Sequence, residues 1–258
     1  MADVVYPPVI LTAKTAFRLL GMKFQMTGLE NVPSSGGVVL ASNHVSYLDF
    51  IFAGLAPWDA HHRLTRFMAK DAVFKHRISG PLMRGMHHIP VDRDAGAASF
   101  RAALKALKAG EIVGVFPEAT ISRSFTVKEI KSGAVRMAAA AKAPILPIAV
   151  WGGQRFWTKG RPRQFPRGQT ISIAVGEPMT VQTRDDMDAA SATLRARLQE
   201  LLDQVQAAHP ATSRPALDAW WLPAHLGGAA PTPEEAQELD DAERNRRAGA
   251  GADEETVG

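Results

Sequence analysis

Short apolar runs alternate with helical patterns along most of this chain, from about residue 8 to residue 208. The runs have the length of buried strands, and the segments between them carry apolar residues three and four positions apart, as on one face of a helix. Strands alternating with helices are typical of α/β layer folds, because each helix crosses over to bring the next strand into the sheet. We therefore expect a central, mostly parallel or mixed sheet of about seven strands, flanked by helices.

The predicted elements follow this alternation without an internal repeat. Strands are expected at residues 37–41, 66–69, 88–91, 112–116, 145–151 and 170–175. Helices are expected at residues 9–20, 95–109, 132–142 and 186–208. Pro90 removes a ladder donor, so its strand should be irregular or lie at an edge. A further helix should run from Tyr47 until Pro57 ends it.

Charge divides the chain unevenly. Residues 1–202 hold 26 basic and 15 acidic side chains, a net charge of +11, whereas residues 203–258 hold 4 and 11, a net charge of −7. A basic body attracts an anionic partner, whether nucleic acid, a phosphorylated metabolite or a membrane surface. Charge alone does not choose among these partners.

Composition suggests three regions. Residues 1–30 form an amphipathic helix and lead-in, residues 31–209 form the domain that carries the site, and residues 210–258 form a tail. The tail is rich in Gly, Ala, Pro and acids and lacks a long apolar stripe, so we expect it to be mostly disordered. Within it, Trp220-Trp221 is expected to dock on the body or on a membrane.

The absence of cysteine excludes disulfides, thiolate metal sites and a cysteine nucleophile. The pairs His61-His62 and His87-His88 are not spaced as metal ligands with any acid cluster, so we expect no metal. Met1-Ala2-Asp3-Val4 lacks the basic start of a secretory leader, and no apolar run reaches the roughly 18 residues of a membrane span. We therefore expect neither.

The segment Asn43-His44-Val45-Ser46-Tyr47-Leu48-Asp49 directly follows the predicted strand 37–41. It lies where a strand opens into a loop, the usual place for a site in an open α/β sheet. On one continuous helix, His44 and Asp49 would point roughly 140° apart. They meet only if His44 lies in the loop before a helix capped near Ser46. Asp49 then holds one imidazole nitrogen and leaves the other as a base; the alternative is a loop histidine beside an ordinary capping acid.

Three more blocks lie at or near predicted strands. Phe116-Pro117-Glu118-Ala119-Thr120 offers a carboxylate, a hydroxyl and backbone amides, with Arg123 nearby for a phosphate. Gly85-Met86-His87-His88-Ile89-Pro90-Val91-Asp92-Arg93 delivers Arg93 past another strand, and Ala143-Pro144-Ile145-Leu146-Pro147-Ile148 is an apolar strand bracketed by prolines. Taken singly, each block fits a turn, a surface arginine or a core strand.

In chain order, the four blocks resemble the motifs of the glycerolipid acyltransferase family, that of the 1-acyl-glycerol-3-phosphate acyltransferases. Its pattern is Asn-His-x₄-Asp, Gly-x₃-Ile-x-Val-x-Arg, Phe-Pro-Glu-Gly-Thr-Arg-Ser and a proline-bearing apolar strand, and the resemblance covers about residues 35–180. It implies that His44 is the general base and that Asp49 orients it. It also implies an acceptor site with Lys70 reaching the phosphate; the expected members are Asn43, Lys70, Arg93, Glu118, Thr120 and Arg123.

The chain departs from this pattern in the Phe116 block. Ala119 stands where the family usually has glycine, and Ile121 where it usually has a phosphate-binding arginine. Arg123, two positions later, is the residue that would supply the missing charge. The departure concerns the phosphate contacts more than the chemistry of the His44 block.

The resemblance implies direct acyl transfer from acyl-CoA or acyl carrier protein to lysophosphatidic acid, giving phosphatidic acid, without a cofactor. Glycerol 3-phosphate or another lysolipid or glycolipid is the alternative acceptor. Backbone amides near His44 or Glu118 would stabilise the oxyanion. A non-catalytic lipid-binding protein on the same fold is the alternative from another class. Nucleic-acid binding is not expected, because no recognised motif is present.

Both substrates carry apolar chains, so we expect a peripheral protein on an anionic membrane surface, at the cytoplasmic face of the cell membrane. The candidate docking surfaces are the helix 9–20 with Lys14, Arg18 and Lys23, the segment 55–67, and Trp220-Trp221. The helix equally fits a role as a cap of the core. A basic run from Lys159 to Arg167 would meet anionic lipid, the phosphates of coenzyme A or only solvent.

Overall fold

The computed structural model describes residues 3–92, 96–211 and 219–255. Their strands form one seven-stranded sheet in the order β1-β7-β6-β2-β5-β3-β4. The strands are β1 (Lys23–Thr27), β2 (Val38–Ser42), β3 (Thr65–Lys70), β4 (Ile89–Val91), β5 (Ile112–Val115), β6 (Ile145–Trp151) and β7 (Thr170–Val175). The α-helices are α1 (Tyr6–Leu19), α2 (Asp49–His61), α3 (Asp71–Lys75), α4 (Ser79–Gly85), α5 (Gly96–Lys108), α6 (Gly133–Ala141), α7 (Met187–Ala208) and α8 (Pro233–Glu255).

The expected mixed α/β sheet is confirmed, and its directions place the functional loops. β2 lies at the centre and pairs in parallel with β5 and β6, while β3 pairs in parallel with β5 and β4. β7 runs antiparallel to β6 and parallel to β1. The five strands from β6 to β4 therefore point the same way. Their carboxyl ends share one side of the sheet, which we call the carboxyl edge.

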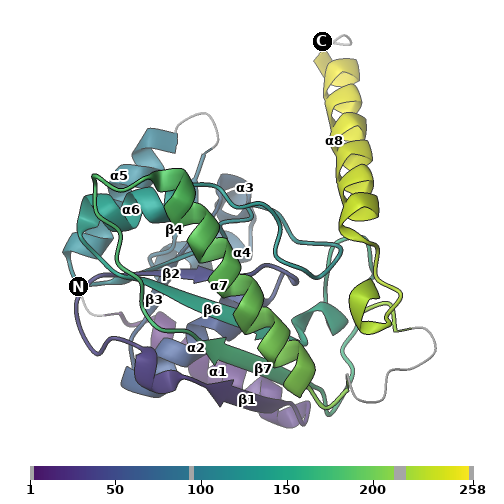
Figure 1. Ribbon diagram of the computed structural model, residues 1–258, viewed down its shortest axis with the longest axis horizontal. Coiled ribbons are helices and arrows are strands. Elements are labelled where there is room, and N and C mark those ends of the chain that lie inside the picture. Colours follow the sequence, from purple (N-terminus) through teal and green to yellow (C-terminus); the bar gives the residue numbers. More distant parts are fainter. Residues whose placement is uncertain (1–2, 93–95, 212–218, 256–258) are drawn as a thin grey trace.

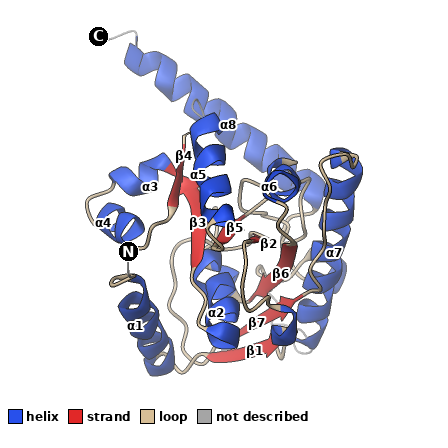
Figure 2. Ribbon diagram, turned by 90° about the vertical axis from the view of Figure 1, so that its left-hand side faces the viewer, coloured by secondary structure: helices blue, strands red, loops and turns tan. Residues whose placement is uncertain are grey.

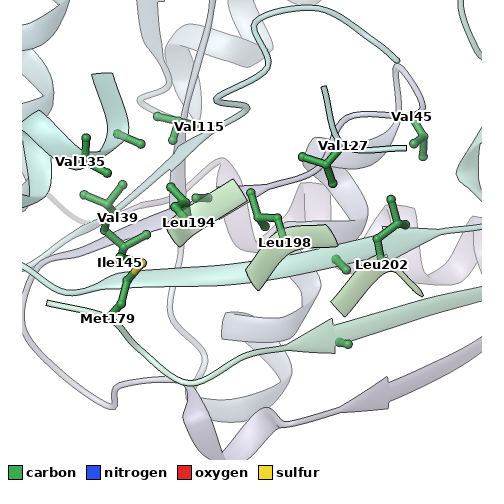
Figure 3. Close-up of a cluster of buried hydrophobic side chains, with 14 of the residues drawn as sticks. Val39, Val45, Val115, Val127, Val135, Ile145, Met179, Leu194, Leu198 and Leu202 are labelled. Carbon is green, nitrogen blue, oxygen red and sulfur yellow. The ribbon is translucent and has the colours of Figure 1, made fainter. Parts of the chain in front are cut away.

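Both faces of the central strand are covered. Successive side chains of a strand point to opposite faces of the sheet, and all the residues of β2 are buried. Val39 packs in one apolar cluster with Leu194 and Leu198 of α7, and Figure 3 shows this cluster. Leu40 packs in the other cluster with Phe52 of α2. Figure 2 shows α1, α3 and α4 on one side of the red strands and α6 and α7 on the other.

Two strands at the edges of the sheet show what the apolar pattern captures. β4 is the outermost strand next to β3 and has three residues, which agrees with the edge position predicted from Pro90. β1 is the other outermost strand and lies outside the predicted ranges. Its residues alternate between exposed and half-buried, so the sequence carries no buried apolar run there.

Pro57 does not end the helix after the His44 loop, so that prediction is wrong. α2 begins at Asp49 rather than Tyr47 and continues through Pro57 to His61. The turn after the proline is held from outside. Asp59 pairs with Lys14 of α1 at 2.5 Å, and the His61 side chain contacts the Val32 carbonyl oxygen at 3.0 Å. These contacts offset the backbone hydrogen bond that proline removes.

The N-terminal helix packs on the body through one face. Tyr6 and Ile10 of α1 are buried in a cluster with Leu55 of α2, whereas Leu11 and Leu19 are exposed. Among the described residues, no helix combines the length and apolar character needed to cross a bilayer. The residues that follow α1 supply β1, so this lead-in also belongs to the sheet.

The described part of the tail is more ordered than the sequence predicted. Trp221 and Leu222 are buried in the body, and the Arg155 guanidinium lies 4.7 Å from the centroid of the Trp221 ring. Trp221 thus docks on the body. Residues 233–255 form α8, the yellow helix whose far end stands clear of the body in Figure 1. Composition missed this helix because its contacts with the body are mainly ionic rather than apolar.

Candidate active site

His44 and Asp49 meet at the carboxyl edge of β2. The Nδ1 atom of His44 lies 3.0 Å from Oδ2 of Asp49. His44 is in the loop before α2 and Asp49 is the first residue of that helix, so the chain folds back as the five-residue spacing requires. The His44 side chain is 18% exposed, whereas that of Asp49 is fully buried. With Nδ1 directed at the carboxylate, Nε2 is the nitrogen that can meet a substrate.

The same oxygen of Asp49 also shapes the loop. Oδ2 accepts hydrogen bonds of 2.7 Å from the backbone amides of Val45 and Ser46. Burial raises the pKa of the Asp49 carboxyl, while its hydrogen bonds with His44 and the two amides oppose that rise by favouring the ionised form. One carboxylate oxygen therefore sets both the backbone turn and the direction of the imidazole.

Asn43 and its neighbours fix the loop to β6. The Asn43 side chain donates to the Val150 carbonyl oxygen at 3.0 Å and accepts from the Val150 amide at 2.7 Å. Further along, Thr158 donates to the Val45 carbonyl oxygen at 2.7 Å. Asn43 is fully buried, so its contacts hold the backbone that carries His44.

Glu118 joins the loop after β5 to the loop after β2. Its Oε1 accepts from the His44 amide at 2.7 Å and its Oε2 accepts from the Lys128 amide at 2.9 Å. Burial raises the pKa of Glu118 to about 8, although the two amide bonds favour its ionised form. Both oxygens thus accept from backbone amides, and the Glu118 side chain holds the backbone of His44 in place.

The other predicted residues that the structure describes are Lys70, Thr120 and Arg123, which lie on other parts of the carboxyl edge. Lys70 is the exposed last residue of β3, and Arg93 lies outside the described residues. Thr120 accepts a hydrogen bond of 3.0 Å from the Lys128 ammonium. Arg123 pairs with two acids of α8, at 3.0 Å to Asp240 and 2.8 Å to Glu243. The structure therefore gathers His44, Asp49, Asn43 and Glu118 in one network and places Arg123 against the tail.

The two departures from the expected motif have local structural correlates. Ala119 has a φ of 61°, in the left-handed region that glycine adopts without strain. Ile121 is buried, at 4% exposure, and so takes a place in the apolar packing.

Sequence reasoning missed several residues that support His44. The His44 ring stacks on Phe116, with ring centroids 4.1 Å apart, and the His44 carbonyl oxygen accepts from the Ser122 amide at 2.8 Å. Phe116 precedes the Pro-Glu pair, so its position after β5 was a usable signal. Nothing in the residue pattern marks Ser122, because it acts through its backbone.

The histidine pairs have separate structural roles. His88 accepts a hydrogen bond from the Phe67 amide at 3.0 Å, and burial lowers its pKa to about 4. His61 contacts the Val32 carbonyl oxygen, as described above. Within the described ranges, no group of three or more His, Cys, Asp or Glu side chains could hold a metal ion.

Comparison with known proteins points to a single family. The model of the acyltransferase family matches residues 23–151. The 1-acyl-sn-glycerol-3-phosphate acyltransferase of Bacillus subtilis is 32% identical over 191 residues, which are 68% of this chain and 88% of that relative. The protein of the same name from Borreliella burgdorferi is 30% identical over 151 residues, 57% of this chain and 58% of that relative.

A solved structure shares the fold. The crystal structure of the 1-acyl-sn-glycerophosphate (LPA) acyltransferase PlsC from Thermotoga maritima matches with a TM-score of 0.66. The match covers 78% of this chain and 79% of that one at 21% sequence identity. At this identity the likeness concerns the arrangement of helices and strands.

Proposed function

Since the chain belongs to the acyltransferase family, we propose that it transfers a fatty acyl group from a thioester to the hydroxyl of lysophosphatidic acid. The product is phosphatidic acid, and the donor is acyl-CoA or acyl carrier protein. The observation that carries this proposal is the contact between His44 and the buried Asp49 carboxylate. The relatives named 1-acyl-sn-glycerol-3-phosphate acyltransferase support the choice of acceptor.

In the proposed reaction His44 acts as a general base through Nε2. It takes the proton of the acceptor hydroxyl as that oxygen attacks the thioester carbonyl carbon. The carbon–sulfur bond then breaks, and the imidazolium returns the proton to the departing thiolate. Asp49 holds Nδ1–H and stabilises the imidazolium between these two steps. Because the acceptor oxygen attacks the thioester itself, the acyl group passes directly to the acceptor and no acyl-enzyme forms.

Attack on the thioester places a negative charge on its carbonyl oxygen, and we assign the stabilisation of this oxyanion to backbone amides of the loop after β5. The amides of residues 44–48 are already bonded: His44 to Glu118, Val45 and Ser46 to Asp49, Tyr47 to Trp157 and Leu48 to the Ser46 hydroxyl. An amide held by a protein acceptor is not available for a transient negative charge. The candidate donors are therefore the amides of Thr120 and Ile121, which follow Glu118.

The proposed reaction takes place at a membrane surface, on its cytoplasmic face. Both substrates are amphipathic, and exposed apolar side chains support the contact: Leu11 and Leu19 on α1, and Val73, Ile78 and Leu82 on and around α3 and α4. Apolar side chains of this kind bind a bilayer surface, and basic neighbours add attraction to anionic lipid. Arg18 supplies that charge on α1, whereas Lys14 is paired with Asp59.

The test is an assay of the purified protein with a panel of acceptors and thioesters, with products identified by mass. Lysophosphatidic acid should be acylated and a free thiol released in equal amount; glycerol 3-phosphate and other lysolipids test the acceptor. His44→Ala should lower turnover about 10²-fold or more while the fold is kept. His225→Ala removes an exposed histidine and is the matched control. Turnover by His44→Ala near that of the control would overturn the mechanism, and lipid binding without thiol release would point to a non-catalytic protein.

A further inference from the structure

Three basic side chains of the body converge on two carboxylates of α8. Arg123, Lys128 and Lys159 form what we call the basic cluster, and Asp240 and Glu243 are the tail carboxylates. Arg123 contacts Asp240 Oδ1 at 3.0 Å and Glu243 Oε2 at 2.8 Å. Lys128 contacts Asp240 Oδ2 at 2.5 Å, and Lys159 contacts Asp240 Oδ1 at 2.7 Å and Glu243 Oε2 at 3.0 Å. Each basic side chain thus reaches at least one tail carboxylate.

The basic cluster is built by the body. Arg123 and Lys128 come from the loop after β5, and Lys159 comes from the loop after β6. A side chain at Gly160 would place its Cβ 2.3 Å from the Arg123 guanidinium, so glycine leaves the space that the arginine occupies. With α8 in place the three side chains are only 14%, 24% and 15% exposed. Three cations this close and this sheltered require a negative partner.

The tail carboxylates present the chemistry of a phosphate monoester. Together they carry two negative charges, and the cluster contacts three of their oxygens. A phosphate monoester carries between one and a half and two negative charges near neutral pH on three acceptor oxygens. Arginine and lysine side chains are the usual partners of such a group. The cluster therefore fits a phosphate monoester in charge and in number of acceptors.

Each member of the cluster is coupled to the His44 loop. Ser122, next to Arg123, donates its amide to the His44 carbonyl oxygen, and Thr158, next to Lys159, donates its hydroxyl to the Val45 carbonyl oxygen. The Lys128 amide shares the Glu118 carboxylate with the His44 amide. The loops that carry the basic cluster are therefore joined by hydrogen bonds to the loop that carries the proposed base.

The attachment of α8 to the body is mostly ionic. Ala236 and Asp240 are its buried residues among those whose side chains the structure describes, and Leu239 is 45% exposed. Figure 1 shows the helix leaving the body beyond this contact. An anionic ligand that pairs with the same three cations would compete with the tail carboxylates for this contact. The docking of α8 therefore depends on the tail carboxylates.

We propose that the basic cluster is a binding site for a phosphate monoester, and that Asp240 and Glu243 occupy it until such a ligand displaces α8. The group that binds there belongs to one of the two substrates, and this identification rests on the proposed function. Lysophosphatidic acid carries a phosphate monoester on its glycerol, and coenzyme A carries one on its ribose. Binding of either would release the tail from the loops that hold His44.

The test measures tail release and binding without turnover, on the full chain. Glycerol 3-phosphate represents the acceptor and adenosine 3′,5′-bisphosphate represents coenzyme A, with sodium chloride at matched ionic strength as the control. Amide hydrogen exchange of residues 233–246 reports release of α8. Calorimetry compares the wild type with the double variant Asp240→Asn, Glu243→Gln. One of the two phosphate monoesters should raise the amide exchange of α8 at an ionic strength where sodium chloride does not. The substrate that this probe represents is then the source of the bound phosphate.

The double variant should bind that probe more tightly, because the internal competitor is gone. If the tail carboxylates occupy the basic cluster in about 90% of wild-type molecules, the dissociation constant of the probe should be about tenfold lower in the double variant. The matched control is Glu234→Gln, Glu238→Gln, which removes two exposed charges of α8. Equal affinities in all three proteins, equal tightening in both variants, or release that follows ionic strength alone would each overturn the proposal.

The site and the proposed function fail separately. Release of α8 by a monoester in a protein that transfers no acyl group keeps the site and rejects the reaction. Acyl transfer with unchanged exchange of α8 keeps the reaction and rejects the displacement. Lys159→Ala adds an independent check on the body side, since it should weaken binding of the probe in the double variant as well.

Discussion

The His44 loop and the basic cluster lie on the same loops of the carboxyl edge but are stabilised in different ways. The His44 loop is held by hydrogen bonds from backbone amides to the buried oxygens of Asp49 and Glu118. The basic cluster is held by ion pairs to a helix whose paired residues lie 81 to 120 positions away in sequence. One arrangement is fixed and largely insulated from solvent, and the other is exchangeable. A proposed catalytic group needs the first kind of support, and a site that binds and releases an anion needs the second.

The largest expected effect tests whether the Asp49 charge matters beyond its geometry. Asp49→Asn keeps an oxygen that can accept from the Val45 and Ser46 amides and from His44, but it removes the charge that stabilises the imidazolium. We expect turnover to fall about 10²-fold or more, with little change in melting temperature. Asp188→Asn, which changes an exposed aspartate in the first turn of α7, is the control. Turnover near that of the control would mean that the loop is only a scaffold.

The second prediction separates the two regions by pH. Glu118 has a pKa of about 8 in the folded chain against 4.5 for the free side chain, so folding favours its protonated form. Its contribution to stability is therefore complete below about pH 4.5 and is lost as the pH rises through 8. The complete loss amounts to roughly 5 kcal/mol of unfolding free energy. Urea unfolding from pH 5 to 8 should show this slope in the wild type and not in Glu118→Gln.

The control for that experiment is Glu129→Gln, which changes an exposed glutamate on the same loop and should keep the wild-type slope. Parallel slopes in the wild type and Glu118→Gln would show that Glu118 titrates as in the unfolded chain. The buried hydrogen bonds would then favour the charged form more strongly than burial opposes it.

The third prediction concerns Asp240, whose pKa is shifted in the opposite direction from that of Glu118. Burial alone would raise the pKa of Asp240, but its bonds to Lys128 and Lys159 and the charge of Lys128 lower it to about 2. Its stabilising contribution is present above the ordinary value of 3.8 and is lost as the pH falls towards 2. After allowance for solvent screening, it amounts to about 1–2 kcal/mol.

Asp240→Asn should remove most of this stabilisation at neutral pH. Amide exchange in α8 should become about tenfold faster, while unfolding of the body changes little. The neighbouring exposed residue gives the control, Asp241→Asn. If Asp240→Asn destabilises the body as much as it speeds exchange in α8, the tail is an integral part of the fold and the contrast between the two regions fails.

The same contrast explains what the sequence predicted. The mixed sheet, most of its strands and the meeting of His44 with Asp49 follow from local patterns, because apolar runs and a five-residue spacing are visible in the chain. The edge strand β1 and the turn after Pro57 depend on partners elsewhere in the fold. Arg123 illustrates the limit: the motif suggested a phosphate contact, whereas its partners in the fold are Asp240 and Glu243, which no local pattern connects to it.

The smallest expected effect concerns Ala119, which lies between the two regions. Its φ of 61° places alanine in the left-handed region, at a cost of about 1 kcal/mol. Ala119→Gly relieves that strain but gives the unfolded chain more freedom, which offsets about half of the gain. We expect the unfolding free energy to rise by about 0.5 kcal/mol, with unchanged exchange in α8. Ala119→Val should lose more than 1 kcal/mol, because a β-branched side chain tolerates this conformation poorly. Since Glu118 faces His44 and Thr120 contacts Lys128, a change in α8 exchange in Ala119→Gly would show that the turn couples the fixed region to the exchangeable one.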